Sequence, residues 1–437
     1  MTIDSFLMEM PVCSSRAVDK SRVVLPLSKS IAARVLVALF WSGGCLDCLE
    51  IPDCDDSREL KGALSSLREW QENPEMGPAA FNMGQGATSL RFFMPVVASL
   101  PGLIADVDCG EGLRRRPVAV LADALIRMGG DVRWRSEECR PPFLISGRTI
   151  VGGEIEMDAS VSSQFVSAMM LSAPMWEKGL SVRYSNGRSV SAPYLEMTAE
   201  VMRRMGAKVR LDVAGVDVTP GGYLPGSMME IEADWSAASY FYEWLLARGR
   251  GVVEIASLAS PEVSLQGDCC CAALMEEVGV ITKWYPDGSA TLSVDSEKWE
   301  AARNNLRGVC WNLDESPDLV PALAVGLCQA GIRFRFEGVA HLRHKETDRM
   351  HALVTELGRL GYRLIPGDST LSWEGERVCS GSEDSDVEIL SYGDHRMAMS
   401  FGAIRSLHPR MQILNPEVVS KSFAGFWKEI SKIDSLS

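Results

Sequence analysis

The stretch SSQFVSAMMLSAPMWEKGLSVRYSNGRSVSAPYLEMTAEVMRRMGAKVRL, residues 162–211, contains the unit that decides the fold. Its first part, 162–173, runs from hydroxyl-bearing residues into an apolar stretch, which predicts a buried helix. A second helix is predicted at 192–206, where apolar residues recur at helical spacing and Gly206 follows the last of them. The strand-like run GAKVRL (206–211) comes next. The pattern therefore indicates an α/β unit built from two different helices and short strands.

Both kinds of helix recur along the chain. The first kind appears six times, with starts 58 to 82 residues apart, at SKSIAARVLVALF (28–40), GATSLRFFMPVVAS (86–99), 162–173, WSAASYFYEWLLA (235–247), PDLVPALAVGLC (317–328) and DHRMAMSFGAIRSL (394–407). The second kind appears at 55–70, 116–130, 192–206, 267–279 and 346–361, and residues 421–435 form a possible sixth. A repeat of about 75 residues indicates a duplicated module, and six copies would make two lobes of three. Helices that end at a glycine occur in any α/β protein, so the alternative is an ordinary α/β protein without a repeat. This alternative explains the regular alternation of the two kinds of helix less well.

Strand-like runs follow several of the second helices. They are GGDVRW (129–134), GAKVRL (206–211), VGVITKW (278–284) and GYRLI (361–365). The region ENPEMGPAA (72–80) is interpreted as a loop or turn insertion. The short apolar run at 319–332 contains Pro321 and is interpreted as a buried helix rather than a membrane span.

Composition excludes several classes of protein. The 437 residues are 46% hydrophobic and 23% charged, with a net charge of −14, so a nucleic-acid partner is disfavoured and a globular protein with more than one core is expected. The first 15 residues carry acids and no long apolar core, and no apolar run reaches the length of a membrane span. We therefore expect a cytoplasmic protein without a membrane partner.

The 12 cysteines include a CxxC pair, Cys45 and Cys48, and a consecutive run at 269–271. A structural zinc site would need a second pair of ligands at suitable spacing, which the five histidines do not supply. Adjacent cysteines are poor disulfide partners, so the cysteine usage is typical of a reducing compartment.

Chemistry is predicted at the starts of the first kind of helix. Free backbone N–H groups and the helix dipole make such ends anion sites, although ordinary capping by Ser, Thr or Asp would explain each one singly. The helix dipole disfavours cations at a helix N-terminus, so capping does not explain the cations found at several of these starts. We expect these cations to bind anions. They are Lys29, Arg34, Arg91, His395 and Arg396.

Three further motifs carry polar groups. GQGATS (84–89) is a tight turn into a helix and lacks the lysine of a nucleotide-binding P-loop. SVSSQF (160–165) offers hydroxyls that could hold a phosphate. RHKETDR (343–349) is either a solvated charge run or a site in which neighbouring cations set the pKa of Glu346 for proton transfer.

Eleven motifs in order, together with the repeats, resemble the 5-enolpyruvylshikimate-3-phosphate (EPSP) synthase family from about residue 20 to 427. They are LPxSKSxxxR (25–34), DxDDxRxL (53–60), GxxxTxxR (84–91), RRRP (114–117), SVSSQF, SxPYxxxT (191–198), SLQGD (264–268), PDxxP (317–321), RxKETDR, GDHRMAM (393–399) and PxxxxKSF (416–423). The resemblance implies a two-lobed inside-out α/β barrel-like fold with three βαβαββ-type repeats in each lobe. It also implies a first lobe of residues 1–27 plus 232–437 and an inserted second lobe of 28–231.

The resemblance further implies transfer of the carboxyvinyl group of phosphoenolpyruvate to the 5-hydroxyl of shikimate 3-phosphate, with release of phosphate. Asp318 matches the base for that hydroxyl, Glu346 matches the group that exchanges a proton with the methylene carbon, and Lys29 matches a third catalytic residue. The implied acceptor site is Lys29, Ser30, Arg34, Ser162, Ser163, Gln164, Ser191, Tyr194, Asp318, His341 and Lys345. The implied donor site is Lys29, Ala87, Thr88, Arg116, Gln164, Arg349, Arg396 and Lys421. No metal or organic cofactor is implied, and a monomer is expected.

The sequence departs from the family pattern at a few positions. Leu27 replaces a glycine, Gln85 and Ala87 alter the donor loop, and His341 replaces an asparagine. Ala87 adds a methyl group at the donor pocket, and we hypothesise that it crowds out glyphosate, a bulkier analogue of the donor.

Two alternatives remain at this point. A transferase that acts on UDP-N-acetylglucosamine would carry a cysteine where this chain has Glu111, although Cys109 lies nearby. A non-catalytic relative would normally have lost an acid, base or lysine, whereas this chain keeps Lys29, Asp318 and Glu346.

Overall fold

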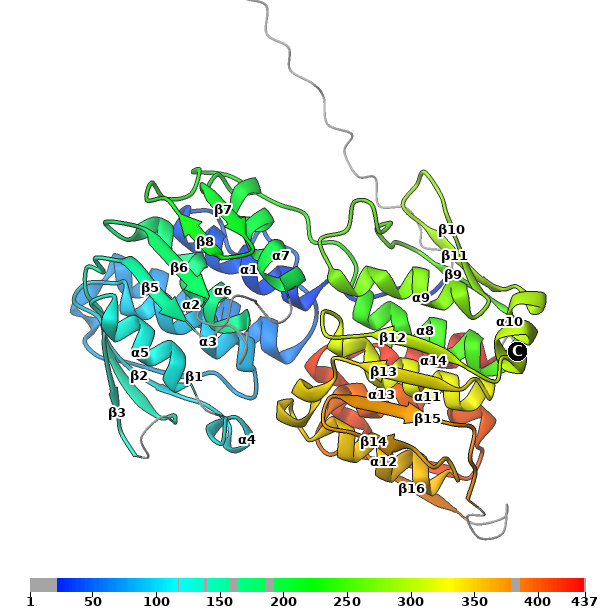
Figure 1. Cartoon of the computed structure of the whole chain (residues 1–437). Coiled ribbons are helices and arrows are strands. Elements are labelled where there is room, and N and C mark those ends of the chain that lie inside the picture. Colours follow the sequence, from blue (N-terminus) through cyan, green and yellow to red (C-terminus); the bar gives the residue numbers. More distant parts are fainter. Residues whose placement is uncertain are drawn as a thin grey trace, which may run out of the picture.

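The computed structural model describes residues 22–116, 118–136, 140–157, 163–184, 192–378 and 386–435. Ser162 and Ser191, both predicted in the acceptor site, lie outside the described residues. The buried apolar side chains form two clusters, one drawn from residues 31–231 and the other from Val23, Leu25 and residues 233–433. Figure 1 shows the two corresponding halves side by side.

The chain crosses between the two halves at adjacent segments. Leu27 pairs with Ala233 in an antiparallel bridge, and the backbone N–H of Ser28 donates to Glu232 O at 2.8 Å. Upstream of this crossing, Val23 pairs with Ile255 on a strand of the second half. The first helix therefore begins directly at the crossing, which places its N-terminal residues between the halves.

In the first half, three inner helices pack on one another and three outer helices flank them. The inner helices are α1 (Lys29–Trp41), α3 (Ala87–Ala98) and α6 (Ser163–Ser172), and the outer ones are α2 (Asp55–Glu72), α5 (Ala119–Arg127) and α7 (Ala192–Arg204), with the short α4 (Glu111–Arg114) before α5. The strands are β1 (Ala79–Asn82), β2 (Ile104–Asp108), β3 (Asp131–Trp134), β4 (Phe143–Ser146), β5 (Gly153–Met157), β6 (Leu180–Tyr184), β7 (Val209–Asp212) and β8 (Gly215–Val218).

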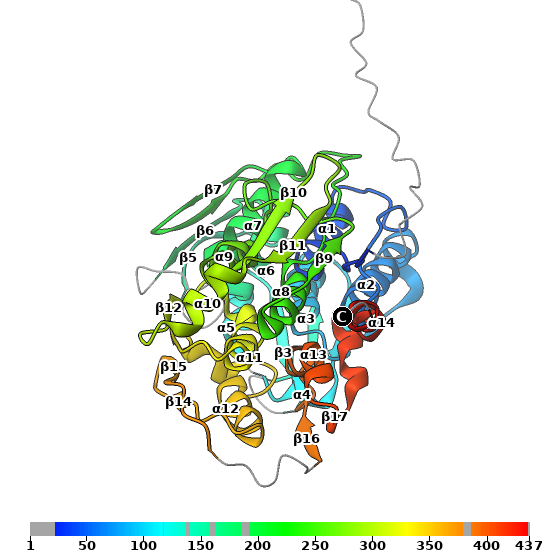
Figure 2. The same cartoon turned by 90° about the vertical axis from the view of Figure 1, so that its right-hand side faces the viewer.

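The second half repeats this arrangement. Its inner helices are α8 (Trp235–Arg248), α11 (Val320–Ala330) and α13 (His395–Ala403), and the others are α9 (Cys271–Glu277), α10 (Ser296–Asn304), α12 (Arg349–Arg359) and α14 (Phe426–Asp434). Its strands are β9 (Val252–Ile255), β10 (Val280–Trp284), β11 (Ala290–Val294), β12 (Val309–Asn312), β13 (Phe334–Glu337), β14 (Ile365–Pro366), β15 (Thr370–Trp373), β16 (Val387–Leu390) and β17 (Met411–Leu414). Figure 2 looks onto this half and shows α8, α11 and α13 in the middle, with β12, β14 and β15 to the left and β9, β10 and β11 above.

Three of the sheets share one topology, which confirms the predicted repeat. Their orders are β1-β2-β4-β3, β5-β6-β8-β7 and β12-β13-β15-β14, each with one parallel pair followed by two antiparallel pairs. Each predicted helix of the first kind appears as an inner helix because it is apolar on every side, as in α11, where nearly all residues are buried. At Gly326, a Cβ would lie 3.2 Å from Glu243 Cγ, so this glycine allows α8 and α11 to approach closely.

Two local predictions were wrong in part. The predicted loop at 72–80 contains a 3-10 turn at Pro74–Met76 and the first residues of β1, because Ala79 and Ala80 pair with β2. The predicted strand GYRLI reaches the sheet only at Ile365, while Tyr362 forms an isolated bridge with Arg377.

In the described residues a disulfide that was not predicted joins Cys45 and Cys48 in the connection from α1 to α2. Within the described parts of the chain, no helix is long and apolar enough to cross a membrane.

Candidate active site

Asp318 lies at the centre of a cluster of cations between the two halves. It belongs to a 3-10 turn (Pro317–Leu319) that leads into α11. Its carboxylate accepts hydrogen bonds from Arg349 Nη1 at 2.9 Å and from Arg396 Nη2 at 2.8 Å, and Lys345 Nζ lies 3.6 Å away. Burial raises the pKa of Asp318, but the charges of Arg396, Lys345 and Arg349 outweigh it and hold the pKa well below its usual range. Asp318 is therefore ionised at neutral pH.

The first half contributes one group to this cluster. Tyr194 on α7 donates its hydroxyl to Asp318 Oδ2 at 3.2 Å, across the space between the halves. Burial and the charge of Asp318 hold the pKa of Tyr194 well above its usual value, so the hydroxyl keeps its proton.

Arg349 and Arg396 are positioned by a second acid, Asp394. Asp394 is the N-cap of α13, where its side chain accepts the N–H of Arg396 at 2.9 Å. Both of its oxygens also accept from Arg349, at 2.7 Å from Nε and 3.3 Å from Nη2. Because this pair of hydrogen bonds is bidentate and both side chains are buried, the orientation of the Arg349 guanidinium is fixed.

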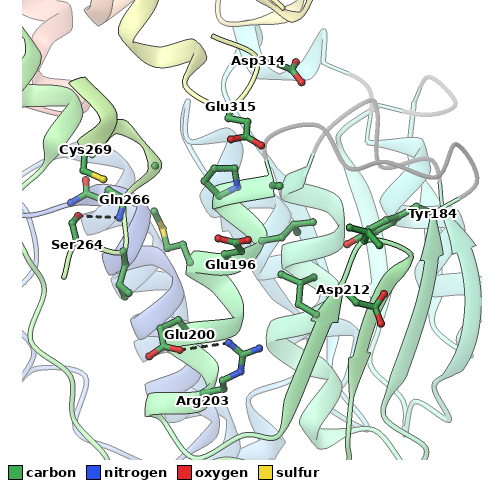
Figure 3. Close-up of a pocket in the computed structure, with 18 of the residues that line it drawn as sticks. Tyr184, Glu196, Glu200, Arg203, Asp212, Ser264, Gln266, Cys269, Asp314 and Glu315 are labelled. Atoms are coloured by element: carbon green, nitrogen blue, oxygen red, sulfur yellow. Dashed lines mark hydrogen bonds and ion pairs between the residues drawn. The ribbon is translucent and has the colours of Figure 1, made fainter. Parts of the chain in front are cut away.

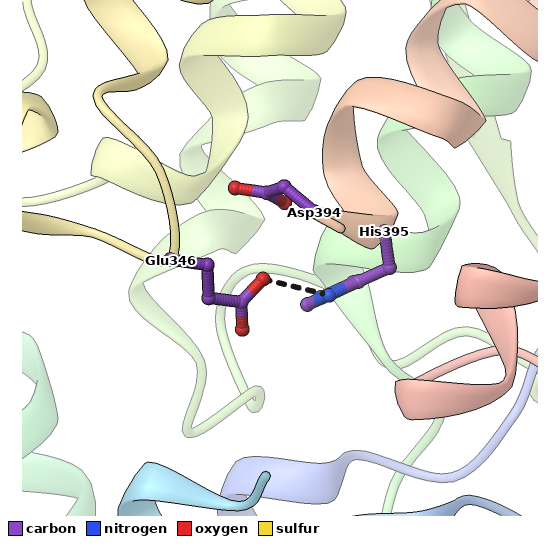
Figure 4. Close-up of side chains that lie close together, drawn as sticks. All are labelled: Glu346, Asp394 and His395. Atoms are coloured by element: carbon purple, nitrogen blue, oxygen red, sulfur yellow. Dashed lines mark ion pairs between the residues drawn. The ribbon is translucent and has the colours of Figure 1, made fainter. Parts of the chain in front are cut away.

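Glu346 lies beside the Arg349–Asp394 pair and forms an ion pair with the buried His395 (Figure 4). Its Oε2 lies 3.1 Å from His395 Nδ1 and 4.0 Å from Arg349 Nη2. Burial raises the pKa of Glu346, but His395, Arg349 and Lys29 together hold it well below its usual range. The oxygens and nitrogens of Glu346, Asp394 and His395 lie within 4.8 Å of one another. A cation could bind them only by displacing Arg349 from Asp394.

Lys29, the first residue of α1, extends toward the second half. Its Nζ donates to Asp56 at 2.9 Å and lies 3.5 Å from the carbonyl oxygen of Lys421. Burial opposes its charge, but Asp56 and Glu346 raise its pKa above the usual value, so the ammonium persists. Lys421 Nζ donates to Gly393 O at 2.8 Å, which places it beside the start of α13. Lys29 thus lies beside Lys421 and close enough to Glu346 for the carboxylate to affect its pKa.

Arg34 is buried one turn further along α1. Its guanidinium donates to Thr198 Oγ1 at 2.7 Å, Ser30 O at 2.6 Å and Tyr194 O at 3.2 Å, and it lies over the ring of Phe92. Burial lowers its pKa to about 10. Among the described residues no acid forms an ion pair with Arg34, so its charge is uncompensated.

The donor residues of the first half lie at two inner helices. Gln164, near the start of α6, accepts a hydrogen bond from Arg91 on α3, whose guanidinium lies 4.8 Å from the ring of Phe165. Burial and the nearby charge of Arg116 lower the pKa of Arg91 to about 10. Arg91 Nε has no hydrogen-bond partner among the described residues.

The remaining predicted residues fall on both sides of the cleft. Ala87 and Thr88 begin α3, and Ser163 begins α6. His341 lies in the second half, where its Nδ1 is 3.8 Å from Asp314 and its Nε2 has no partner. Burial and the charge of Lys345 lower the pKa of His341 to about 4, so the imidazole is neutral. No described contact joins Ala87, Thr88 or Arg116 to the cations of the second half.

A cavity of about 1270 Å³ lies beside the cluster, between α7 and the segments 264–269 and 312–315 (Figure 3). Its lining includes the acids Glu196, Glu200, Asp212, Asp314 and Glu315 but none of the clustered cations. An acidic wall repels phosphates and carboxylates, so the reaction is better placed at the cation cluster than in this larger space.

Three acids of the cluster were not predicted to have a role, and His395 was predicted only as a cation that binds anions at a helix start. Asp56 and Asp394 hold Lys29 and Arg349, and His395 holds Glu346. Asp268, the last residue of SLQGD, accepts from Ser236 and has its pKa raised to about 6 by burial and by the charge of Asp318. All four lie inside quoted motifs, but only the fold reveals their partners.

Comparison with known proteins agrees with this geometry. The family model for EPSP synthase (3-phosphoshikimate 1-carboxyvinyltransferase) matches residues 17–430. The chain is 34% identical to the 3-phosphoshikimate 1-carboxyvinyltransferase of Bacteroides fragilis strain YCH46, covering 94% of this chain and 95% of that one. It is 30% identical to the enzyme of the same name from Pseudoalteromonas translucida, covering 94% and 96%.

A solved structure of EPSP synthase from Acinetobacter baumannii superimposes with a TM-score of 0.67 at 18% identity, covering 94% of this chain and 95% of that one. This likeness confirms the two-lobed inside-out α/β architecture. Because the EPSP synthase family model matches residues 17–430, which is nearly the whole chain, the chain belongs to the EPSP synthase family.

Proposed function

We propose that the cluster around Asp318, Glu346 and Lys29 performs the reaction of this family. That reaction transfers the enolpyruvyl group of phosphoenolpyruvate to the 5-hydroxyl of shikimate 3-phosphate and releases phosphate, in the pathway to chorismate and the aromatic amino acids. The observation that supports these roles best is the ionised Asp318, held by Arg349 and Arg396 and facing Tyr194 across the cleft.

In the proposed addition step, Asp318 accepts the proton of the acceptor hydroxyl as its oxygen attacks C2 of the donor. The methylene carbon gains a proton at the same time. In the elimination step the same carbon loses a proton, the vinyl group re-forms, and phosphate leaves. Each proton transfer needs a group within about 3 Å of the reacting atom. Asp318 and Glu346 are the acids that the cations of the cluster orient for these two transfers.

The ion pairs of the cluster indicate how these acids become active. Asp318 and Glu346 have strongly lowered pKa values because neighbouring cations favour their charged forms. The donor brings a phosphate and a carboxylate, and we propose that these bind the same arginines and lysines. Sharing the cations with substrate anions raises the pKa of both acids toward ordinary values, which makes them better proton acceptors and donors.

The proposed donor site combines Arg349, Arg396, Lys29 and Lys421 with groups of the first half. Arg91 and Gln164 lie together there, and Arg116 is close enough to perturb the pKa of Arg91. Closure of the two lobes would bring these groups to the donor. The two separate cores and the crossing at Leu27 and Ala233 support lobe boundaries near residues 27 and 232.

Arg34 and His341 are proposed to bind the acceptor. An arginine buried without an acid partner suits the carboxylate of shikimate 3-phosphate, and it already contacts Tyr194 O. The neutral His341 has an unpartnered Nε2 that can bond a hydroxyl of the acceptor, as the asparagine usual at this position could. We also propose that the enzyme is a cytoplasmic monomer, which cell fractionation and light scattering on the purified protein would test.

The decisive assay measures phosphate released from phosphoenolpyruvate with shikimate 3-phosphate or with UDP-N-acetylglucosamine as the acceptor. We expect release only with the first. Asp318→Ala and Glu346→Ala should each lower turnover by roughly 10²- to 10⁴-fold. Glu315→Gln is the matched control, since Glu315 is exposed on the same segment and, among the described residues, forms no ion pair with the clustered arginines. Near-native turnover of either alanine variant would show that its assigned role is wrong.

A further inference from the structure

The turn that follows α1 presents two cysteine side chains to solvent and two leucine side chains to the core. Cys45 and Cys48 are exposed, whereas Leu46 and Leu49 are each only 6% exposed. A backbone hydrogen bond from Leu49 N to Leu46 O closes the turn. Because the leucines are buried in the core of the first lobe, they fix the direction of the cysteine that directly precedes each of them.

The two cysteines are joined by a disulfide, and their Cα atoms lie 5.4 Å apart. This separation is within the range that a disulfide requires, so the bond needs no movement of the backbone. The same turn can hold two thiols, since the buried leucines anchor it in either state. Both redox states are therefore compatible with one fold, and both cysteines are exposed residues.

The other described cysteines lack this arrangement. Cys54, Cys109, Cys271 and Cys328 are buried, Cys269 and Cys270 are half-buried, and Cys310 is exposed; none of these seven forms a disulfide within the described residues. Metal binding by the pair alone would leave a zinc ion without its usual four ligands. The exposed pair at the surface of the first lobe is thus set apart by both access and geometry.

We propose that Cys45 and Cys48 form a thiol–disulfide exchange site that reacts with low-molecular-weight disulfides such as glutathione disulfide. In the first step one cysteine thiolate attacks the reagent, forms a mixed disulfide and releases one glutathione thiolate. In the second step the other cysteine attacks the bound cysteine sulfur, closes the Cys45–Cys48 bond and releases the second glutathione. The protein loses two electrons and two protons, and the reagent is reduced to two thiols.

Closing this bond constrains the connection between α1, which carries Lys29, and α2, which carries Asp56. A four-residue ring removes only a small part of the entropy of the unfolded chain. We therefore expect the oxidised protein to melt about 2–5 °C above the reduced protein. A Cys45→Ser/Cys48→Ser double variant should show no such difference.

The test is mass analysis of peptides from the full chain. The protein is reduced, freed of reductant, treated with glutathione disulfide and alkylated with N-ethylmaleimide. The peptide with Cys45 and Cys48 should carry neither label nor glutathione and should be two hydrogens lighter than the dithiol. Cys310 is the internal control and should carry glutathione or the label.

Single variants separate the two steps. With Cys48→Ser the exchange should stop at a glutathione adduct on Cys45, and with Cys45→Ser it should stop on Cys48. The proposal is overturned if the native protein keeps both cysteines alkylated while Cys310 reacts, or if glutathione remains bound at either cysteine of the native pair.

Discussion

Replacing Asp318 with asparagine should weaken catalysis and, at the same time, strengthen the binding of a simple anion. The carboxylate of Asp318 is the internal counter-charge of Arg349 and Arg396, at 2.9 and 2.8 Å, with Lys345 at 3.6 Å. Asparagine keeps the size of the side chain but removes its charge. The three cations then lack one acid, and an added phosphate ion no longer competes with Asp318 for them.

The size of the effect follows from these contacts. A hydrogen bond to a charged group contributes about 1.5–3 kcal/mol, so an anion that no longer has to displace one should bind roughly 10- to 150-fold more tightly. Removing one partner of a buried ion pair costs about 3–5 kcal/mol of stability when nothing replaces it. Turnover should fall by roughly 10²- to 10⁴-fold if Asp318 is the base.

Isothermal titration with inorganic phosphate and urea unfolding with and without phosphate measure these quantities. Phosphate should restore much of the stability that the Asp318→Asn variant loses, whereas Glu315→Gln should behave like the native protein in both assays. If Asp318→Asn binds phosphate no more tightly than the native chain, then Asp318 does not compete with substrate anions, and the proposed activation by cation sharing is wrong.

Three further variants test other parts of the structure. Glu243 is fully buried, and its carboxylate has no hydrogen-bond partner among the described residues. Burial raises the pKa of Glu243 well above its usual value. Above about pH 4.3 the folded chain therefore keeps a proton that the unfolded chain has lost. Stability should therefore fall as pH rises above that value, and Glu243→Gln should remove a slope of up to about 1.4 kcal/mol per pH unit in urea unfolding, with no gain at pH 4. Ala87→Gly should make the enzyme roughly 5- to 150-fold more sensitive to glyphosate in inhibition curves, and equal sensitivity would reject crowding by the methyl group. Ser420→Ala removes the 3.0 Å hydrogen bond to Asp55 that joins the two lobes, and it should lower kcat/KM about 2- to 10-fold, while unchanged kinetics would show that this contact does not support closure.

The repeat was predictable from sequence because the two kinds of helix differ in their apolar pattern. Helices such as α11 are apolar all round and must be interior, whereas α12 has one apolar face and lies outside. The β-strands were less predictable because a run such as GYRLI is too short to specify its own pairing. Only Ile365 of that run reaches the sheet.

The pairing of the charged residues could not be predicted in the same way. Arg349 and Asp394 are 45 residues apart, and Tyr194 and Asp318 are 124 residues apart, so only the packing of helices determines that they meet. The cations were identified at helix starts because the dipole disfavours them there. The acids that neutralise them were identified only in part, since Asp56 and Asp394 have an equally good local explanation as helix-starting residues.

The arrangement of charge in the cleft resolves an apparent conflict in the composition. The chain carries a net charge of −14, yet its proposed substrates are anions. Within the cluster, Asp318, Asp394, Asp56 and Glu346 neutralise Lys29, Arg349 and Arg396, so the cations are not left exposed to bind any anion. A single weak anion gains little by displacing one internal acid. A donor that presents both a phosphate and a carboxylate can engage several cations at once, and the acids that it displaces are those that the reaction needs for proton transfer.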